Sequence, residues 1–296
     1  MKLPFVTLDV FTHTRFAGNS LAVVFDADAL ETPAMQKIAR EFSHPETVFV
    51  LNPQMGGTAR ARIFTPALEM PFAGHPTVGT AIALALKRNA GSNIVLEEKI
   101  GLLKCSVKTE GSDFGRAKFI LPSLPAVAGR PAGSALIAAA LGVLESDIGF
   151  DGHAPSRWSV GNTVNFVPLK NLDAVRRAHI EESAWDAAFD GPHRGLTFVF
   201  CGETDDKVNH FHARMFAPRF GVREDPATGS AVAAFAGFCA TALALKDDDH
   251  RFIIEQGYEM GRPSLIELTL TLRGGTLTTA SIGGDAIVVT EGKVET

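Results

Sequence analysis

Two copies of one short motif carry residue types that can move protons. His75 begins HPTVGTA in the first half of the chain, and Asp225 begins DPATGSA in the second half. In each copy a proline is followed by small and hydroxyl-bearing residues, a composition typical of a helix N-terminus. Free backbone N–H groups and the positive end of the helix dipole attract anions to such a terminus. The two motifs therefore predict a carboxylate-binding cleft shared between the two halves.

His75 and Asp225 differ in how well a structural role explains them. Asp is a preferred N-cap residue, worth about 1 kcal/mol, so a cap would account for Asp225. Imidazole is not among the preferred caps, and a positive helix end disfavours its protonated form. We therefore favour a functional His75 that is neutral near pH 7.

Both motifs belong to a longer internal repeat. RIFTP at 62–66 matches RMFAP at 214–218, and GNS at 18–20 matches GNT at 161–163. Solenoid repeats recur about every 20–50 residues, so copies this far apart indicate a duplicated domain instead. A site between two related halves, with different chemistry on each side, is the expected consequence.

Each half has the pattern of several strands around one long apolar helix. Central helices are expected from 76 to about 87 and from 229 to about 245. A helix that is apolar on nearly every face is normally buried, and a strongly curved sheet would bury it. Other helices are expected from 32 to about 42 and at 134–141. The predicted fold class is α+β.

The domain boundary is expected in LPSLPAVAGRPAG at 121–133, which is rich in Pro and Gly and lies near the midpoint. The second half has more expected strands at its end than its own domain needs. The last segment is therefore expected to complete the first domain. The predicted domains are residues 1–120 with about 283–296, and residues 121–282.

Composition excludes several classes of function. A hydrophobic content of 46% with 21% charged residues is that of an ordinary globular protein. The net charge of −5 gives no electrostatic reason to bind nucleic acid. The opening MKLPFVTLDVF does not resemble a signal peptide, and no stretch approaches the roughly 18 apolar residues of a membrane span. These features and three widely spaced cysteines favour a cytoplasmic protein with reduced thiols.

Neither a cofactor nor a metal is expected. The sequence has no Walker loop and no G-x-G-x-x-G segment. His210 and His212 would share one face of a strand, but without a third ligand a solvated or interface pair is expected. A hydrolase triad of Ser230, His75 and Asp225 is disfavoured because the G-x-S-x-G elbow is missing.

Four segments spread over the chain resemble one known family. They are DVFTHTRFAGNSLAVVF at 9–25, FAGHPTVGTA at 72–81, EDPATGSA at 224–231 and EQGYEMGRPS at 255–264. Together they resemble the phenazine-biosynthesis PhzF-like family. The resemblance implies the diaminopimelate-epimerase-like fold: two similar domains, each a curved, barrel-like, mostly antiparallel sheet around a central helix, with the active site in the interdomain cleft. It also implies a homodimer.

The resemblance assigns a role to Glu46, in SHPETVFV at 43–50. In PhzF itself the matching Glu is the acid/base and follows a Ser, whose place Pro45 takes here. The catalytic residues are thus expected to be Glu46, His75 and Asp225. The residues expected to bind substrate are Asn19, Gly74, Pro76, Thr77, Ala227, Thr228, Gly229 and Ser230.

The cysteines argue against one mechanism of the fold relatives. The epimerase relatives use a pair of cysteines, one at each helix mouth. Cys105, Cys201 and Cys239 all lie outside the two motifs. Racemisation by two thiols is therefore disfavoured.

The function predicted from these features is a cofactor-independent isomerase of a small carboxylate substrate. Its acid/base proton shift would resemble the isomerisation of a dihydro-hydroxyanthranilate. One alternative is a racemase or epimerase of an amino or hydroxy acid, with Glu46 and either His75 or Asp225 as opposed bases. The other is a non-catalytic metabolite-binding or interaction protein that keeps the cleft without turnover.

Overall fold

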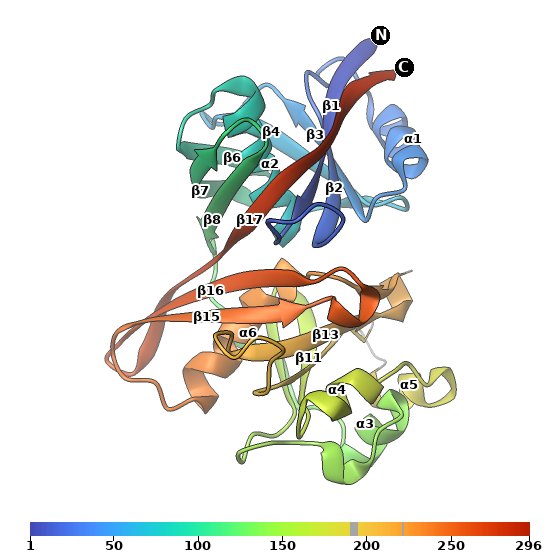
Figure 1. Cartoon of the computed structure of the whole chain (residues 1–296), viewed down its shortest axis with the longest axis vertical. Helices are drawn as coiled ribbons and strands as arrows, with labels where there is room; N and C mark the ends of the chain where they lie inside the picture. The colour runs from blue at the N-terminus through green and yellow to red at the C-terminus, as the bar shows by residue number, and fades with distance from the viewer. Residues whose placement is uncertain (190–194, 221) are drawn as a thin grey trace. The chain divides into compact units, whose positions relative to one another are not determined.

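Figure 1 shows the computed structural model, which describes residues 1–189, 195–220 and 222–296. The chain divides into two units. The N-terminal unit comprises Met1–Pro122 and Ser281–Thr296, and the C-terminal unit is Ser123–Ala280. The last strand, β17 (Thr276–Glu295), starts in the C-terminal unit and continues in the N-terminal unit.

The N-terminal unit is a closed β-barrel. Its strands are β1 (Lys2–Val10), β2 (Asn19–Val24), β3 (Glu46–Leu51), β4 (Ala59–Phe64), β5 (Glu69–Met70), β6 (Asn93–Glu98), β7 (Gly101–Glu110), β8 (Phe114–Ile120) and most of β17. The order around the barrel is β1–β2–β3–β4–β6–β7–β8–β17, and β17 pairs back with β1. The β2–β3 and β4–β6 pairs are parallel, and the other pairs in this order are antiparallel. Closure leaves the barrel without an open edge.

Helix α2 (Gly74–Arg88) runs through this barrel. It contacts β1, β2, β3, β6, β7 and β8, and every residue from Gly74 to Leu84 is buried. Small residues make this possible: a Cβ added at Gly79 would lie 2.5 Å from the Leu21 side chain. Helix α1 (Thr32–Phe42) instead covers the outside of the barrel, against β3 and β4 (Figure 1).

The C-terminal unit repeats the same pairing scheme. Its strands are β9 (Ala126–Val127), β10 (Ser156–Val160), β11 (Asn162–Pro168), β12 (Thr197–Cys201), β13 (Phe211–Ala217), β14 (Val222–Asp225), β15 (Asp249–Gln256) and β16 (Ser264–Arg273). The order is β9–β10–β11–β12–β13–β15–β16, with β11–β12 and β13–β15 parallel. Short β14 pairs with β13 as short β5 pairs with β4. The duplication predicted from the motifs is confirmed.

Helix α6 (Gly229–Ala242) is the central helix of the C-terminal unit. It contacts β9, β10, β11 and β16, which come from both ends of the strand order, so the sheet curves around it. Phe235 on α6 packs against the rings of Phe166, Phe198 and Phe200. The predicted α+β fold of curved sheets around central helices is confirmed.

Three further helices of the C-terminal unit share a core cluster with Trp185, which is fully buried. They are α3 (Ser134–Leu141), α4 (Leu172–Arg177) and α5 (Glu182–Phe189). The unit also has the 3₁₀ turns η1 (Glu145–Asp147), η2 (Pro218–Phe220) and η3 (Tyr258–Met260). None of the helices in the described residues is long and apolar enough to cross a membrane.

The helix predictions hold with two differences. The expected helices at 32–42 and 134–141 are α1 and α3 with those bounds. Helix α2 begins at Gly74 rather than at Pro76, so His75 lies inside its first turn. Helix α6 ends at Ala242, short of the expected end near Leu245. Short α4 and α5 were not predicted.

Candidate active site

Glu46 and His75 meet in the N-terminal unit. Glu46 is the first residue of β3, and the parallel pairing of β3 with β2 places it beside Leu21. His75 is the second residue of α2. Its Nε2 lies 3.3 Å from Glu46 Oε2, and the two side chains are 5% and 17% exposed. Two of the three predicted catalytic residues therefore form a nearly buried acid–base pair.

The imidazole of His75 is neutral and has a defined tautomer. Burial lowers its pKa to about 3, although a hydrogen bond to the backbone carbonyl of Ser20 works in the opposite direction, and nearby His44 disfavours a second positive charge. Since Nε2 faces Glu46, the bond to Ser20 belongs to Nδ1, which must carry the hydrogen. Nε2 then presents a lone pair to Glu46.

The other predicted residues of this unit lie on the elements that carry that pair or pair with them. Gly74, Pro76 and Thr77 lie in the first turn of α2 and are buried. The N-cap residue, Ala73, has no side chain that could cap the helix, so the turn lacks a side-chain acceptor for its first N–H groups. Asn19 is fully buried at the start of β2, the strand that pairs with β3.

Asp225 forms a separate group in the C-terminal unit. It ends β14, and its Oδ2 accepts a hydrogen bond from the Thr228 hydroxyl. Gln256 Nε2 donates to the Asp225 carbonyl at 2.7 Å and to Thr228 Oγ1 at 3.0 Å. The Thr228 N–H donates to Gln256 Oε1 at 3.0 Å. Asp225 is thus held by the residue that caps α6 and is not itself the cap.

The small residues around the start of α6 have different exposures. Ala227 and Gly229 are buried, whereas Thr228 and Ser230 are half-buried. The Thr228 hydroxyl is already bonded to Asp225 and to Gln256. Gln256, which organises the turn, was not among the predicted site residues, although it belongs to the motif at 255–264.

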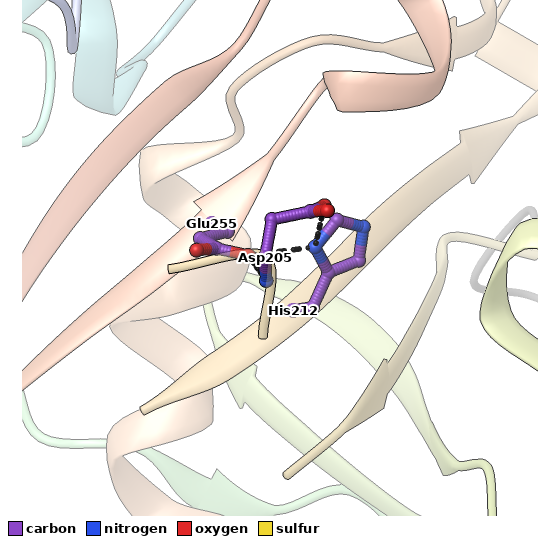
Figure 2. Close-up of side chains that lie close together, drawn as sticks. All are labelled: Asp205, His212 and Glu255. Carbon is purple, nitrogen blue, oxygen red and sulfur yellow. Dashed lines mark hydrogen bonds and ion pairs between the residues drawn. The ribbon is translucent and has the colours of Figure 1, made fainter. Parts of the chain in front are cut away.

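His212 forms a charged cluster that the sequence did not predict. Figure 2 shows the side chains of Glu255 and Asp205 close to the same ring nitrogen of His212. His212 Nδ1 lies 2.8 Å from Glu255 Oε2 and 3.5 Å from Asp205 Oδ2, while Nε2 lies 2.9 Å from Glu259 Oε1. Burial opposes protonation of His212, but its hydrogen bonds to Glu255 and Glu259 prevail and raise its pKa to about 9. The expected solvated or interface pair with His210 is wrong, because His212 is fully buried and His210 is exposed outside the strand.

The geometry of this cluster does not suit a metal ion. Ligand atoms of Asp205, His212 and Glu255 lie within 4.8 Å of one another. Glu255, however, already accepts bonds from the N–H groups of Asp205 and Asp206 and from Asn209 Nδ2. Both nitrogens of a protonated His212 carry hydrogens, so neither has a lone pair for a metal.

The three cysteines are poor nucleophiles. Burial raises the pKa of Cys105 and of Cys201 to about 12, and raises that of Cys239 well above its usual range. A thiol acts as a base or nucleophile only as its thiolate. This supports the expectation that thiol-based racemisation is not the chemistry of this chain.

Comparisons with known proteins point to one family. The model of the phenazine biosynthesis-like protein family matches residues 8–292. An uncharacterized isomerase of Mesorhizobium japonicum is 47% identical over 302 residues, covering 98% of both chains. A trans-2,3-dihydro-3-hydroxyanthranilate isomerase of Pseudomonas fluorescens is 33% identical over 292 residues, with 98% of both covered. The crystal structure of a Bacillus anthracis phenazine biosynthesis protein of the PhzF family matches with a TM-score of 0.90 at 28% identity, covering 100% of both chains.

Proposed function

Because the chain belongs to the phenazine biosynthesis-like family, we propose that it isomerises a small cyclic carboxylate by a cofactor-free proton shift. Isomerisation is the reaction class of this protein, as the names of its relatives state. The substrate class is part of the proposal. It rests on the relatives named for trans-2,3-dihydro-3-hydroxyanthranilate and on the helix N-termini that suit a carboxylate.

The observation that carries the proposal is the contact between Glu46 and neutral His75. Because Nδ1–H is held by Ser20, His75 can take a proton only at Nε2, and that would create a buried imidazolium. A proton that the pair takes up from a substrate therefore resides on Glu46. As a carboxylate, Glu46 takes a proton from a substrate carbon. As the resulting acid, it donates a hydrogen bond to Nε2 until it returns the proton to another carbon.

The helix N-termini serve as anion sites in this proposal. In the N-terminal unit the first turn of α2 carries His75 and offers backbone N–H groups to a carboxylate. In the C-terminal unit the first turn of α6 offers the Ser230 hydroxyl, and the segment before it offers the Asp225 carboxylate; both can orient hydroxyl or amino groups of a ligand. A positioned acid/base contributes about 10²–10⁴ in rate, so Glu46 is the most sensitive test.

The experiment is a solvent-exchange assay on a panel of cyclic amino and hydroxy carboxylates that includes trans-2,3-dihydro-3-hydroxyanthranilate. The protein is incubated with each compound in D₂O, and NMR follows deuterium uptake and isomer formation. Glu46→Gln is expected to lower turnover by about 10²–10⁴ while the fold is kept. Glu41→Gln, which changes an exposed carboxylate on α1, is the matched control and keeps full activity. Wild-type turnover in Glu46→Gln would refute the assignment.

The same assay separates the alternatives. Deuterium uptake at one stereocentre with loss of optical purity indicates a racemase or epimerase rather than a shift between two carbons. Binding of panel compounds without exchange or isomerisation indicates a metabolite-binding protein. Isomer formation without loss of optical purity supports the proton shift.

A further inference from the structure

Strand β6 ends in two adjacent carboxyl groups with opposite surroundings. Glu97 accepts hydrogen bonds at 2.6–2.8 Å from the backbone N–H groups of Gln54, Met55 and Gly57. Burial disfavours the ionised form of Glu97 and so raises its pKa. The three N–H donors favour the ionised form more strongly, so the pKa lies below the usual range. Side chains of adjacent strand residues point to opposite faces, so Glu98 turns the other way, toward α2.

The two short contacts of the Thr77 hydroxyl favour a protonated Glu98. Thr77 Oγ1 lies 2.8 Å from the Ala73 carbonyl and 2.8 Å from Glu98 Oε1. A hydroxyl has a single hydrogen, which can reach only one of these oxygens. If Glu98 is protonated, its O–H donates to Thr77 and Thr77 donates to Ala73, so both contacts become hydrogen bonds.

The surroundings of Glu98 agree with a neutral acid. The residue is 4% exposed, and its Oε2 is buried without a hydrogen-bond partner. An unpartnered carboxylate oxygen costs much more to bury than the carbonyl oxygen of a neutral acid. Burial raises the pKa of Glu98 to about 8, although its hydrogen bond with Thr77 lowers it.

The second copy of the fold holds a permanently neutral group at the matching place. Strand β15 ends in Glu255 and Gln256, as β6 ends in Glu97 and Glu98. Glu255 accepts loop N–H groups as Glu97 does. Gln256 Nε2 donates to the Thr228 hydroxyl at the start of α6, and that hydroxyl donates onward to Asp225. Thr77 and Thr228 are not counterparts in the repeat, but at the end of both strands a side chain contacts a threonine hydroxyl near the start of the central helix, and in the second copy that side chain is an uncharged donor.

We propose that Glu98 is a positioning residue that remains protonated and donates to Thr77, so that the first turn of α2 holds His75 against Glu46. Its catalytic consequence rests on the function proposed above. If Glu98 were ionised, its negative charge would lie next to the Thr77 and Ala73 oxygens. The resulting repulsion would displace this turn. The titratable neighbours do not compensate such a charge: the buried Cys105 thiol is protonated, His75 is neutral, and Glu97 is bound on the other face.

The direct test is infrared and NMR titration of the wild-type protein with ¹³C-labelled glutamate carboxyl groups. One carboxyl is expected to stay protonated at neutral pH and to titrate near pH 8, and its signal is expected to disappear in Glu98→Gln. Glu97→Gln is the matched control and keeps that signal. The absence of any such carboxyl in the wild type would overturn the proposal without reference to a variant.

Thermal unfolding gives a second readout that needs no substrate. A carboxyl with a raised folded-state pKa makes the protein less stable as pH rises from about 4.5 to 8. The melting temperature of Glu98→Gln relative to wild type is therefore expected to increase over this interval. A difference that does not vary with pH would contradict a protonated Glu98.

Turnover distinguishes the two proposals. With a substrate from the panel, the wild type is expected to lose activity near pH 8, and Glu98→Gln is expected to keep it. If no panel compound reacts, the proposed function fails, and the titrations still decide the protonation of Glu98.

Discussion

The charged cluster around His212 predicts a specific loss of stability at alkaline pH. Its pKa of about 9 in the folded protein exceeds the ordinary value of 6.5, so the folded state binds this proton more tightly. The stabilisation is complete below pH 6.5 and is lost as pH rises through 9. At 1.36 kcal/mol per pKa unit, the difference corresponds to at most about 3–4 kcal/mol. At about 2 °C per kcal/mol for a chain of this size, that is a shift of at most roughly 7 °C in melting temperature.

The assay is thermal unfolding of the wild type and of His212→Gln between pH 6 and 9.5. Glutamine keeps one donor but cannot carry the charge, so the variant is expected to melt lower at pH 6. The gap between the two proteins should narrow as pH approaches 9.5. His210→Gln is the control: burial lowers the pKa of His210, so this change should add no pH dependence above pH 7. A gap that stays constant over the interval would refute the charged state of His212.

Two further predictions concern buried positions in the two units. Burial lowers the pKa of His75 to about 3, so the wild type loses stability as pH falls from 6.5 toward 3, and His75→Gln should unfold at a lower pH in an acid titration. Gly237→Ala should lower the free energy of unfolding by about 1–3 kcal/mol in urea denaturation, because its Cβ would lie 2.2 Å from the Trp158 ring. Gly202→Ala, whose Cβ meets only ordinary contacts, should stay close to wild type, and equal stability of the two glycine variants would contradict the steric argument.

Local sequence was sufficient to predict the central helices. Helices α2 and α6 consist of small and apolar residues on every face, and such segments form stable helices only where the rest of the chain surrounds them. The start of α1 could also be predicted from the sequence, because Pro33 lies in its first turn. Helices α4 and α5 are too short to show a periodic pattern, and their burial around Trp185 is a tertiary contact.

The candidate site depended on contacts between distant segments. Nothing in SHPETVFV distinguishes Glu46 from other loop carboxylates, and its proximity to His75 arises from the parallel pairing of β3 with β2 around α2. Likewise, sequence spacing misassigned His212, since its neighbours come from β15, from η3 and from the loop that carries Asp205. The catalytic roles of Glu46, His75 and Asp225 and the roles of the substrate-binding residues stay predictions.

The sequence by itself determined the duplication, the two buried helices and the residue types at their N-termini. These features can be read from the composition and spacing of the residues, because the burial of apolar side chains is what produces such patterns in a sequence. Only the tertiary structure decided which of the buried carboxyl groups is protonated. Glu97 and Glu98 are identical neighbours in sequence, yet Glu97 accepts hydrogen bonds from three backbone N–H groups, whereas Glu98 is buried with one hydroxyl contact and one unpartnered oxygen. The charge of a carboxyl depends on the donors and the water that the fold leaves around it.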